Sequence, residues 1–95
     1  MPLQDIQNEH ARLSILRALD ALNYSSNDSI IKDSCHEFGN SMSSDQVRTQ
    51  LGWLAEQGLV NVSRKGNYMI AMLTSRGQDV VQGISFVDGV KRPRA

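Results

Sequence analysis

The sequence has little cysteine, no net charge and no long hydrophobic run. Its single cysteine, Cys35, has no partner for an internal disulfide, which agrees with a reducing compartment. No apolar stretch approaches the roughly 20 residues that a membrane helix needs. The amino terminus, Met1 to Asp5, lacks the basic start and apolar segment of a signal peptide. We therefore expect a cytoplasmic protein with no membrane partner.

Sequence patterns of catalysis and of metal binding are also lacking. There is no glycine-rich phosphate loop, no set of metal ligands and no nucleophile motif. Cys35 and His36 are adjacent, so their side chains would point in different directions on a helix, whereas a metal site normally needs three or four ligands. We expect a protein that is not an enzyme and that binds neither a cofactor nor a metal.

What is present is enough for one domain of ordinary globular composition. The chain has 95 residues, of which 40% are apolar and 21% are charged. Its charge is unevenly distributed, because residues 1–45 hold seven carboxylates and three cations and residues 46–95 hold the reverse. Such asymmetry is typical of an anion-facing surface, although many DNA-binding domains have a frank basic excess instead.

Two helices are predicted in the first half of the chain. The apolar residues of segment 4–23 recur at helical spacing and cover about half of the helix circumference. Either the rest of the domain wraps this helix, or one edge of it packs against a second subunit. A shorter helix is predicted over 29–38, capped by Asp28 or Ser29. Its expected buried residues are Ile30, Ile31 and Phe38.

The third predicted helix has the clearest limits. Ser43 and Ser44 are both good N-cap residues, Gln46 completes a capping box with Ser43, and Gly58 ends the helix. Two alternating segments, 59–64 and 68–73, flank a turn that contains glycine and predict a β-hairpin. A last short helix is predicted over 75–82. A short helix, a turn and a capped third helix form a helix-turn-helix unit.

Segment 43–60 resembles the recognition-helix region of winged helix-turn-helix regulators of the ArsR and MarR groups. Leu73-Thr74-Ser75-Arg76-Gly77 is similar to the Leu-Thr-x-x-Gly that commonly follows the wing in those proteins. The chain also resembles small winged-helix proteins of Mu-like phages and prophages, in Asp45-Gln46-Val47-Arg48, Trp53-Leu54 and the closing Gly89-Val90-Lys91-Arg92-Pro93.

The expected fold class is therefore mainly α with a small β-hairpin, a winged helix-turn-helix. It consists of a three-helix core, a two-stranded wing and a short carboxyl-terminal helix. We expect this single domain to occupy residues 1–88 and to be followed by a basic, flexible tail at 89–95.

The resemblance implies sequence-specific binding of double-stranded DNA by a phage-type transcriptional regulator. The third helix would enter the major groove, where arginine, glutamine and threonine side chains read base edges. Helix caps, wing-tip cations and the basic tail would contact phosphates. The expected DNA-binding residues are Ser43, Ser44, Gln46, Arg48, Thr49, Gln50, Arg64 and Lys65, with diffuse contacts from Lys91, Arg92 and Arg94. A homodimer is expected, because one short helix reads few base pairs.

An alternative function is a protein-interaction module that keeps the fold without binding DNA, such as a phage assembly or packaging accessory. The zero net charge and the outward positions predicted for Asp45 and Glu56 favour it. Trp53 is the candidate partner-binding residue if its ring is exposed, since tryptophan is enriched at interface hot spots. Otherwise Trp53 folds over the domain's own wing, beside Tyr68.

Overall fold

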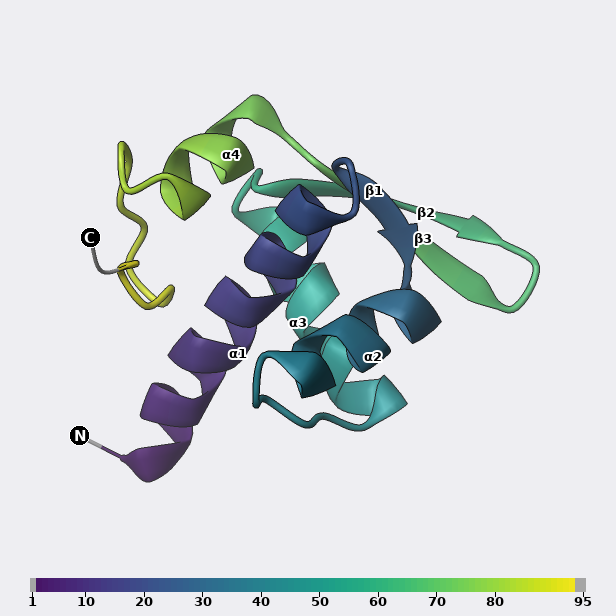
Figure 1. Ribbon diagram of the computed structural model, residues 1–95, viewed down its shortest axis with the longest axis horizontal. Coiled ribbons are helices and arrows are strands. Elements are labelled where there is room, and N and C mark those ends of the chain that lie inside the picture. Colours follow the sequence, from purple (N-terminus) through teal and green to yellow (C-terminus); the bar gives the residue numbers. More distant parts are fainter. Residues whose placement is uncertain (1, 94–95) are drawn as a thin grey trace.

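The structure is a computed structural model that describes residues 2–93, so Met1, Arg94 and Ala95 lie outside it. The described residues form four helices and three strands, and the long first helix crosses the body diagonally (Figure 1). In chain order the elements are α1 (Leu3–Ala21), β1 (Ser25–Asn27), α2 (Asp28–Glu37), α3 (Ser44–Glu56), β2 (Val60–Lys65), β3 (Tyr68–Leu73) and α4 (Ser75–Val81). This order matches the predicted fold class.

Helix α1 is the centre of the core. Its buried residues are Ala11, Leu13, Ile15, Leu16, Ala18 and Leu19. Helices α2, α3 and α4 and the sheet all pack against it. Most of the wide apolar surface predicted for this helix is thus covered by its own domain, because Leu13, Ile15, Leu16 and Leu19 are at most 4% exposed. Only the first turns leave large apolar side chains open, at Leu3 and Ile6.

Helix α2 begins one residue earlier than expected, and of the three side chains expected to be buried only Ile31 is. Asn27 is its N-cap, with Oδ1 accepting a hydrogen bond from Ile30 N at 2.9 Å, so the predicted cap at Asp28 or Ser29 is wrong. Ile31 and Cys35 are buried, whereas Ile30 and Phe38 are 45% and 52% exposed. A ten-residue helix offers the core only one stripe. Ile31 and Cys35 are four residues apart and form that stripe.

The sheet has a third strand that the sequence did not predict. Strand β1 pairs antiparallel with β3, from Ser25 opposite Met72 to Asn27 opposite Ile70, and gives the order β1-β3-β2. Tyr24, which adopts a left-handed backbone with φ of 76°, precedes β1 and its carbonyl accepts Leu73 N at 2.6 Å. The predicted turn at 23–28 is therefore part turn and part strand. Beyond Ile70 the hairpin continues as two strands alone, and it forms the wing.

The start of α4 explains the Leu-Thr-x-x-Gly pattern. Thr74 caps the helix by accepting Gly77 N at 3.0 Å, while its hydroxyl lies 2.8 Å from the Gly58 carbonyl. Gly77 itself lies against the backbone of Leu59, where an added Cβ would come within 2.2 Å of the carbonyl oxygen. The pattern thus joins α4 to the turn between α3 and β2.

Residues 89–93 pack back onto the body, which differs from the tail expected after residue 88. Val90 is 7% exposed and belongs to the core. Lys91 N donates to the Glu9 carbonyl at 3.2 Å, and the Gly89 carbonyl accepts Arg12 Nη1 at 2.9 Å. None of the helices described between residues 2 and 93 combines the length and the apolarity that crossing a membrane requires.

Candidate nucleic-acid interface

The amino-terminal end of α3 is the first part of the candidate interface. Ser43 Oγ accepts Gln46 N at 3.1 Å, and Gln46 Oε1 accepts Ser43 N at 2.8 Å, which is the predicted capping box. Ser44 follows as the first helical residue and is exposed. The cap fixes where the helix begins, and it engages the oxygen of the Gln46 side chain.

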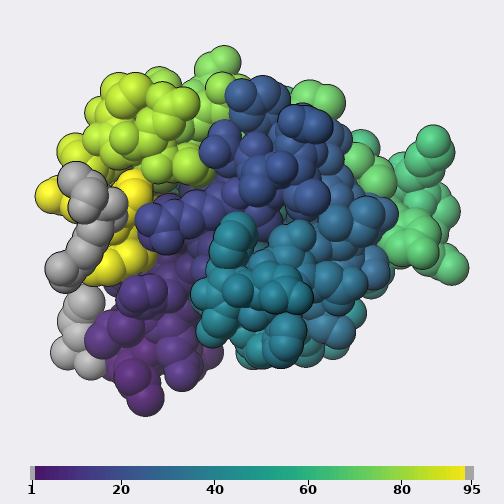
Figure 2. Space-filling model, in the orientation of Figure 1, coloured from purple at the N-terminus to yellow at the C-terminus, as the bar shows by residue number. Residues whose placement is uncertain are grey.

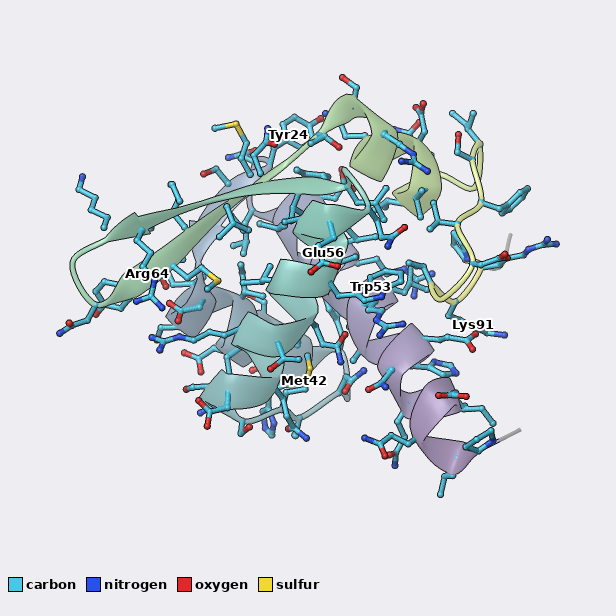
Figure 3. All side chains as sticks on the ribbon, turned by 180° about the vertical axis from the view of Figure 1, so that it is seen from behind. Tyr24, Met42, Trp53, Glu56, Arg64 and Lys91 are labelled. Carbon is cyan, nitrogen blue, oxygen red and sulfur yellow. The ribbon has the colours of Figure 1, made fainter. Side chains whose placement is uncertain are left out.

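Thr49 lies one turn further along α3 and is also exposed. Asp45, Thr49 and Glu56 occupy the solvent side of the helix, and Figure 3 shows Glu56 on the face of α3 that looks away from the core. This face thus presents one small hydroxyl between two carboxylates. It does not have the cationic character that the DNA-binding hypothesis expects of a recognition helix.

Arg48 is half-exposed, and its guanidinium is engaged within the molecule. Arg48 Nε donates to Asp28 Oδ2 at 2.6 Å, forming an ion pair with a carboxylate that is only 6% exposed. Arg48 Nη2 donates to the carbonyl of Asn67 at 2.9 Å, in the turn between β2 and β3. The side chain expected to read a base therefore joins α3 to α2 and to the wing.

Asp28 accepts hydrogen bonds from three elements. Besides Arg48, its Oδ1 accepts Ser29 N at 3.1 Å and Met69 N at 3.3 Å. Burial alone would raise the pKa of Asp28, but these hydrogen bonds and the charge of Arg48 outweigh it and hold the pKa below its ordinary value. The carboxylate is consequently ionised and paired near neutral pH.

Gln50, an expected DNA-binding residue on the outer face or the flanks of α3, is instead turned towards the core. The residue is 8% exposed and faces α1. Its Oε1 accepts Arg12 Nε at 2.8 Å, and its Nε2 donates to Asn8 Oδ1 at 3.1 Å. Gln50 lies three residues after Val47, on the helix face that packs into the core, and the polar groups of α1 make its burial tolerable.

The wing supplies the free cations of the candidate interface. Arg64 and Lys65 end β2 and are both exposed, with Lys65 paired to Tyr68 across the hairpin. In the space-filling view the hairpin extends beyond the compact body as a separate lobe (Figure 2). Because Arg48 touches Asn67 in the wing turn, the first half of α3 and the wing tip are neighbours.

Trp53 packs on its own fold, but not on the wing. The Arg12 guanidinium lies over the indole ring, 3.8 Å from its centroid. An added Cβ on Gly89 would come within 2.7 Å of the same ring, so the backbone of Gly89 lies against the indole as well. Figure 3 shows Trp53 between α3 and α1, at a distance from Arg64 on the hairpin. The expected contact with Tyr68 is therefore wrong, and the ring is only half-exposed.

Three residues that matter here were not singled out from the sequence as functional. They are Asp28, Asn67 and Arg12, and each acts through a partner at least 19 positions away in the chain. The only available signal was Asp28 at a helix start, which was interpreted as a cap. Of the tail cations, Lys91 is half-buried and Arg92 is exposed over the Phe86 ring, while Arg94 lies outside the described residues.

The chain is similar to two curated proteins, and no protein-family model matches it. It is 48% identical over 92 residues to uncharacterized protein gp26 of Escherichia phage Mu, covering 97% of this chain and 96% of that protein. It is 42% identical over 77 residues to an uncharacterized protein of Haemophilus influenzae, covering 80% of this chain and 76% of that one.

Solved structures of similar fold are winged-helix proteins. A winged-helix DNA-binding protein from STIV has a TM-score of 0.64 at 13% identity, over 74% of this chain and 77% of that one. BpsR of Bordetella bronchiseptica, whose DNA binding is regulated by 6-hydroxynicotinic acid, has a TM-score of 0.64 at 19% identity. That match covers 76% of this chain and 48% of BpsR. At these identities the similarity shows the fold, and the predicted winged-helix class is confirmed.

Proposed function

The chain belongs to the family of phage Mu protein gp26 and has a winged-helix fold, and from this premise we propose that it binds double-stranded DNA. The observation that carries the proposal is the juxtaposition of the α3 amino terminus with a cationic wing tip, joined through Arg48 and Asn67. A helix and a hairpin side by side match a major groove and the adjacent backbone in shape. The similar proteins from STIV and B. bronchiseptica bind DNA.

In this proposal the contacts divide into two kinds. Ser43, Ser44, Arg64 and Lys65 meet phosphates, which fix the register of the protein on the duplex. Thr49 and the free amide nitrogen of Gln46 meet base edges and provide sequence specificity. Gln50 has no part in the contact, since its amide is bonded to α1.

The test is a titration of labelled random-sequence duplex with protein, followed by fluorescence anisotropy at low and moderate salt. We expect the logarithm of affinity to fall linearly with that of salt. Arg64→Ala weakens binding and lowers the salt slope by about 0.9, the value of one phosphate contact. Arg17→Ala, which removes an exposed cation from α1, leaves both unchanged. Absence of binding at low salt, even at about 50 μM where non-specific contacts normally register, would refute the proposal.

We further propose that the protein acts as a homodimeric regulator of the ArsR/MarR type, encoded by phage or prophage. One short helix reads few base pairs, and two-fold symmetry doubles the site. Large apolar side chains are exposed near both ends of the chain, and they would form the dimer interface. They are Leu3, Ile6, Ile84 and Phe86. Sedimentation velocity tests the dimer, and selection from a random duplex library followed by Thr49→Ala tests the specificity.

A second candidate is binding of a protein partner through α3. What favours it is charge, because Asp45 and Glu56 are exposed on this helix while Arg48 is neutralised by Asp28. Under this alternative the random duplex is not bound. Reversing both charges, Asp45→Lys with Glu56→Lys, then abolishes capture of the partner. Under the DNA proposal the same change raises the affinity of the protein for the duplex.

A further inference from the structure

Arg48 lies where α3, the start of α2 and the wing turn meet. Its Nε bonds to the buried carboxylate of Asp28, at the start of α2, and its Nη2 bonds to the Asn67 carbonyl in the wing turn. The two donors of a single rigid, planar guanidinium thus engage acceptors on two different elements. A lysine in the same position has a point charge on a flexible stem, and it cannot hold both acceptors in a fixed fork.

The distal wing depends on this arrangement more than its base does. Strand β1 supports β3 only between Ile70 and Met72, so the hairpin beyond that point is a two-stranded ribbon. Isolated two-stranded ribbons are marginally stable in water. The tip is tied to the body where Asp28 Oδ1 accepts Met69 N and where Arg48 reaches Asn67.

We propose that Arg48 is a positioning residue of the interface: with Asp28 it sets the wing at a fixed angle to α3. Arg64 and Lys65 then meet the phosphates of the same duplex that α3 enters. This inference rests on the proposed DNA binding for its consequence, but the fixed wing itself is a property of the free protein. It gives Arg48 a different role from the base contact expected from the sequence.

The decisive variants are Arg48→Lys, which keeps the charge, and Asp28→Asn, which keeps the size of the buried side chain. For a positioning residue, both variants weaken binding of the random duplex and lower its salt slope by up to about 1.8, the value of two wing phosphates. An Arg48 that reads bases or phosphates gives the opposite result for Asp28→Asn. Freed from its carboxylate, the guanidinium then binds the duplex as tightly as before or more tightly, and the inference is overturned.

A double-mutant cycle separates positioning of the wing from a general loss of structure. In the wild type, the change Arg64→Ala with Lys65→Ala lowers affinity by the full contribution of the wing. In the Arg48→Lys background the same pair of changes has little further effect, because the wing no longer meets the phosphates. Equal losses in the two backgrounds would show that Arg48 does not act through the wing.

The free protein provides a readout that does not require DNA. In ¹H–¹⁵N spectra, Arg48→Lys shifts the amides of Gly66 and Asn67 and lowers their heteronuclear NOE, while the amides of α1 stay unchanged. A rigid wing in this variant would refute the positioning role even if the wild type binds DNA well. A mobile wing with no DNA binding by the wild type would instead refute the proposed function and leave the arrangement intact. Arg48→Lys keeps a positive charge beside the buried carboxylate of Asp28, so this variant is expected to fold.

Discussion

At the scale of single residues, Gly77 is the glycine that leaves the least room for a side chain. The added Cβ of an alanine would lie 2.2 Å from the Leu59 carbonyl oxygen and 2.6 Å from the Leu73 side chain. The backbone oxygen cannot move aside without disturbing the turn between α3 and β2. Helical propensity and close packing therefore have opposite effects at this position, and packing is the larger of the two.

We predict that Gly77→Ala lowers the free energy of unfolding by about 2 kcal/mol, the usual cost of overpacking. The matched control is Gly52→Ala in α3, where nothing lies within 4 Å of the new Cβ. This control gains helical propensity and raises the free energy of unfolding by about 1 kcal/mol. Urea denaturation of both variants measures the difference, and effects of equal sign would contradict the packing argument.

The pairing of Asp28 predicts a dependence of stability on acid. Its pKa is lower in the folded state, so the carboxylate contributes stability above its ordinary pKa of 3.8, and that contribution is lost as the pH falls through the lowered folded value. Asp28→Asn removes this part of the pH dependence. Unfolding curves at pH 7 and at successive values below about pH 4 test it. If wild type and variant lose stability in parallel over that range, Asp28 is not the group that titrates.

At the scale of elements, the start of α3 is fixed by one side chain. Ser43→Ala removes the hydroxyl that accepts Gln46 N, and we expect a loss of about 1 kcal/mol in the free energy of unfolding. Ser44→Ala, one position further and exposed, changes it by a few tenths of a kcal/mol at most. Thermal denaturation followed by circular dichroism distinguishes the two variants. A loss of stability in Ser44→Ala as large as that in Ser43→Ala would contradict the assignment of Ser43 as the N-cap.

Elements with strong local signals were predictable from the sequence. Helix α3 has a capping box, an apolar stripe and a terminating glycine within 16 residues, and its predicted start was confirmed. Strand β1 has none of these, since Ser25–Asn27 is short and polar, and its pairing depends on β3, which lies more than 40 positions later. Contacts of that kind leave no periodicity in a single sequence.

The exposed residues of the candidate interface were also predictable, whereas the hydrogen-bond partners of its residues were not. Exposure of Ser44 and Thr49 follows from helical periodicity, and exposure of Arg64 and Lys65 follows from their place next to the hairpin turn. The partners of Arg48 and Gln50 do not, because Asp28 and Arg12 come from other helices and no spacing rule relates them. Position along the chain therefore indicated that Arg48 approaches the surface, but not which atoms it engages, and for Gln50 it indicated neither the face nor the partners.

At the scale of the whole molecule, the carboxyl-terminal segment completes the core. Val90→Ala removes buried methyl groups beside α1, and we expect the free energy of unfolding to fall by about 2 kcal/mol. Ile30→Ala in α2 is the control, because Ile30 is 45% exposed and its truncation leaves no buried cavity. Urea midpoints compare the two variants. Unchanged stability in Val90→Ala would show that residues 89–93 add nothing to the core and behave as the flexible tail expected from the sequence.

The position of Trp53 also means that intrinsic tryptophan fluorescence reports on one defined part of the molecule. It is the one tryptophan of the chain, and its indole lies under Arg12 and against Gly89, away from the wing. The emission of an indole moves to shorter wavelengths in apolar surroundings, so the emission of Trp53 follows the contact of Gly89 with its ring. A change in emission when the wing meets a ligand would mean that the two ends of the molecule are coupled through α3.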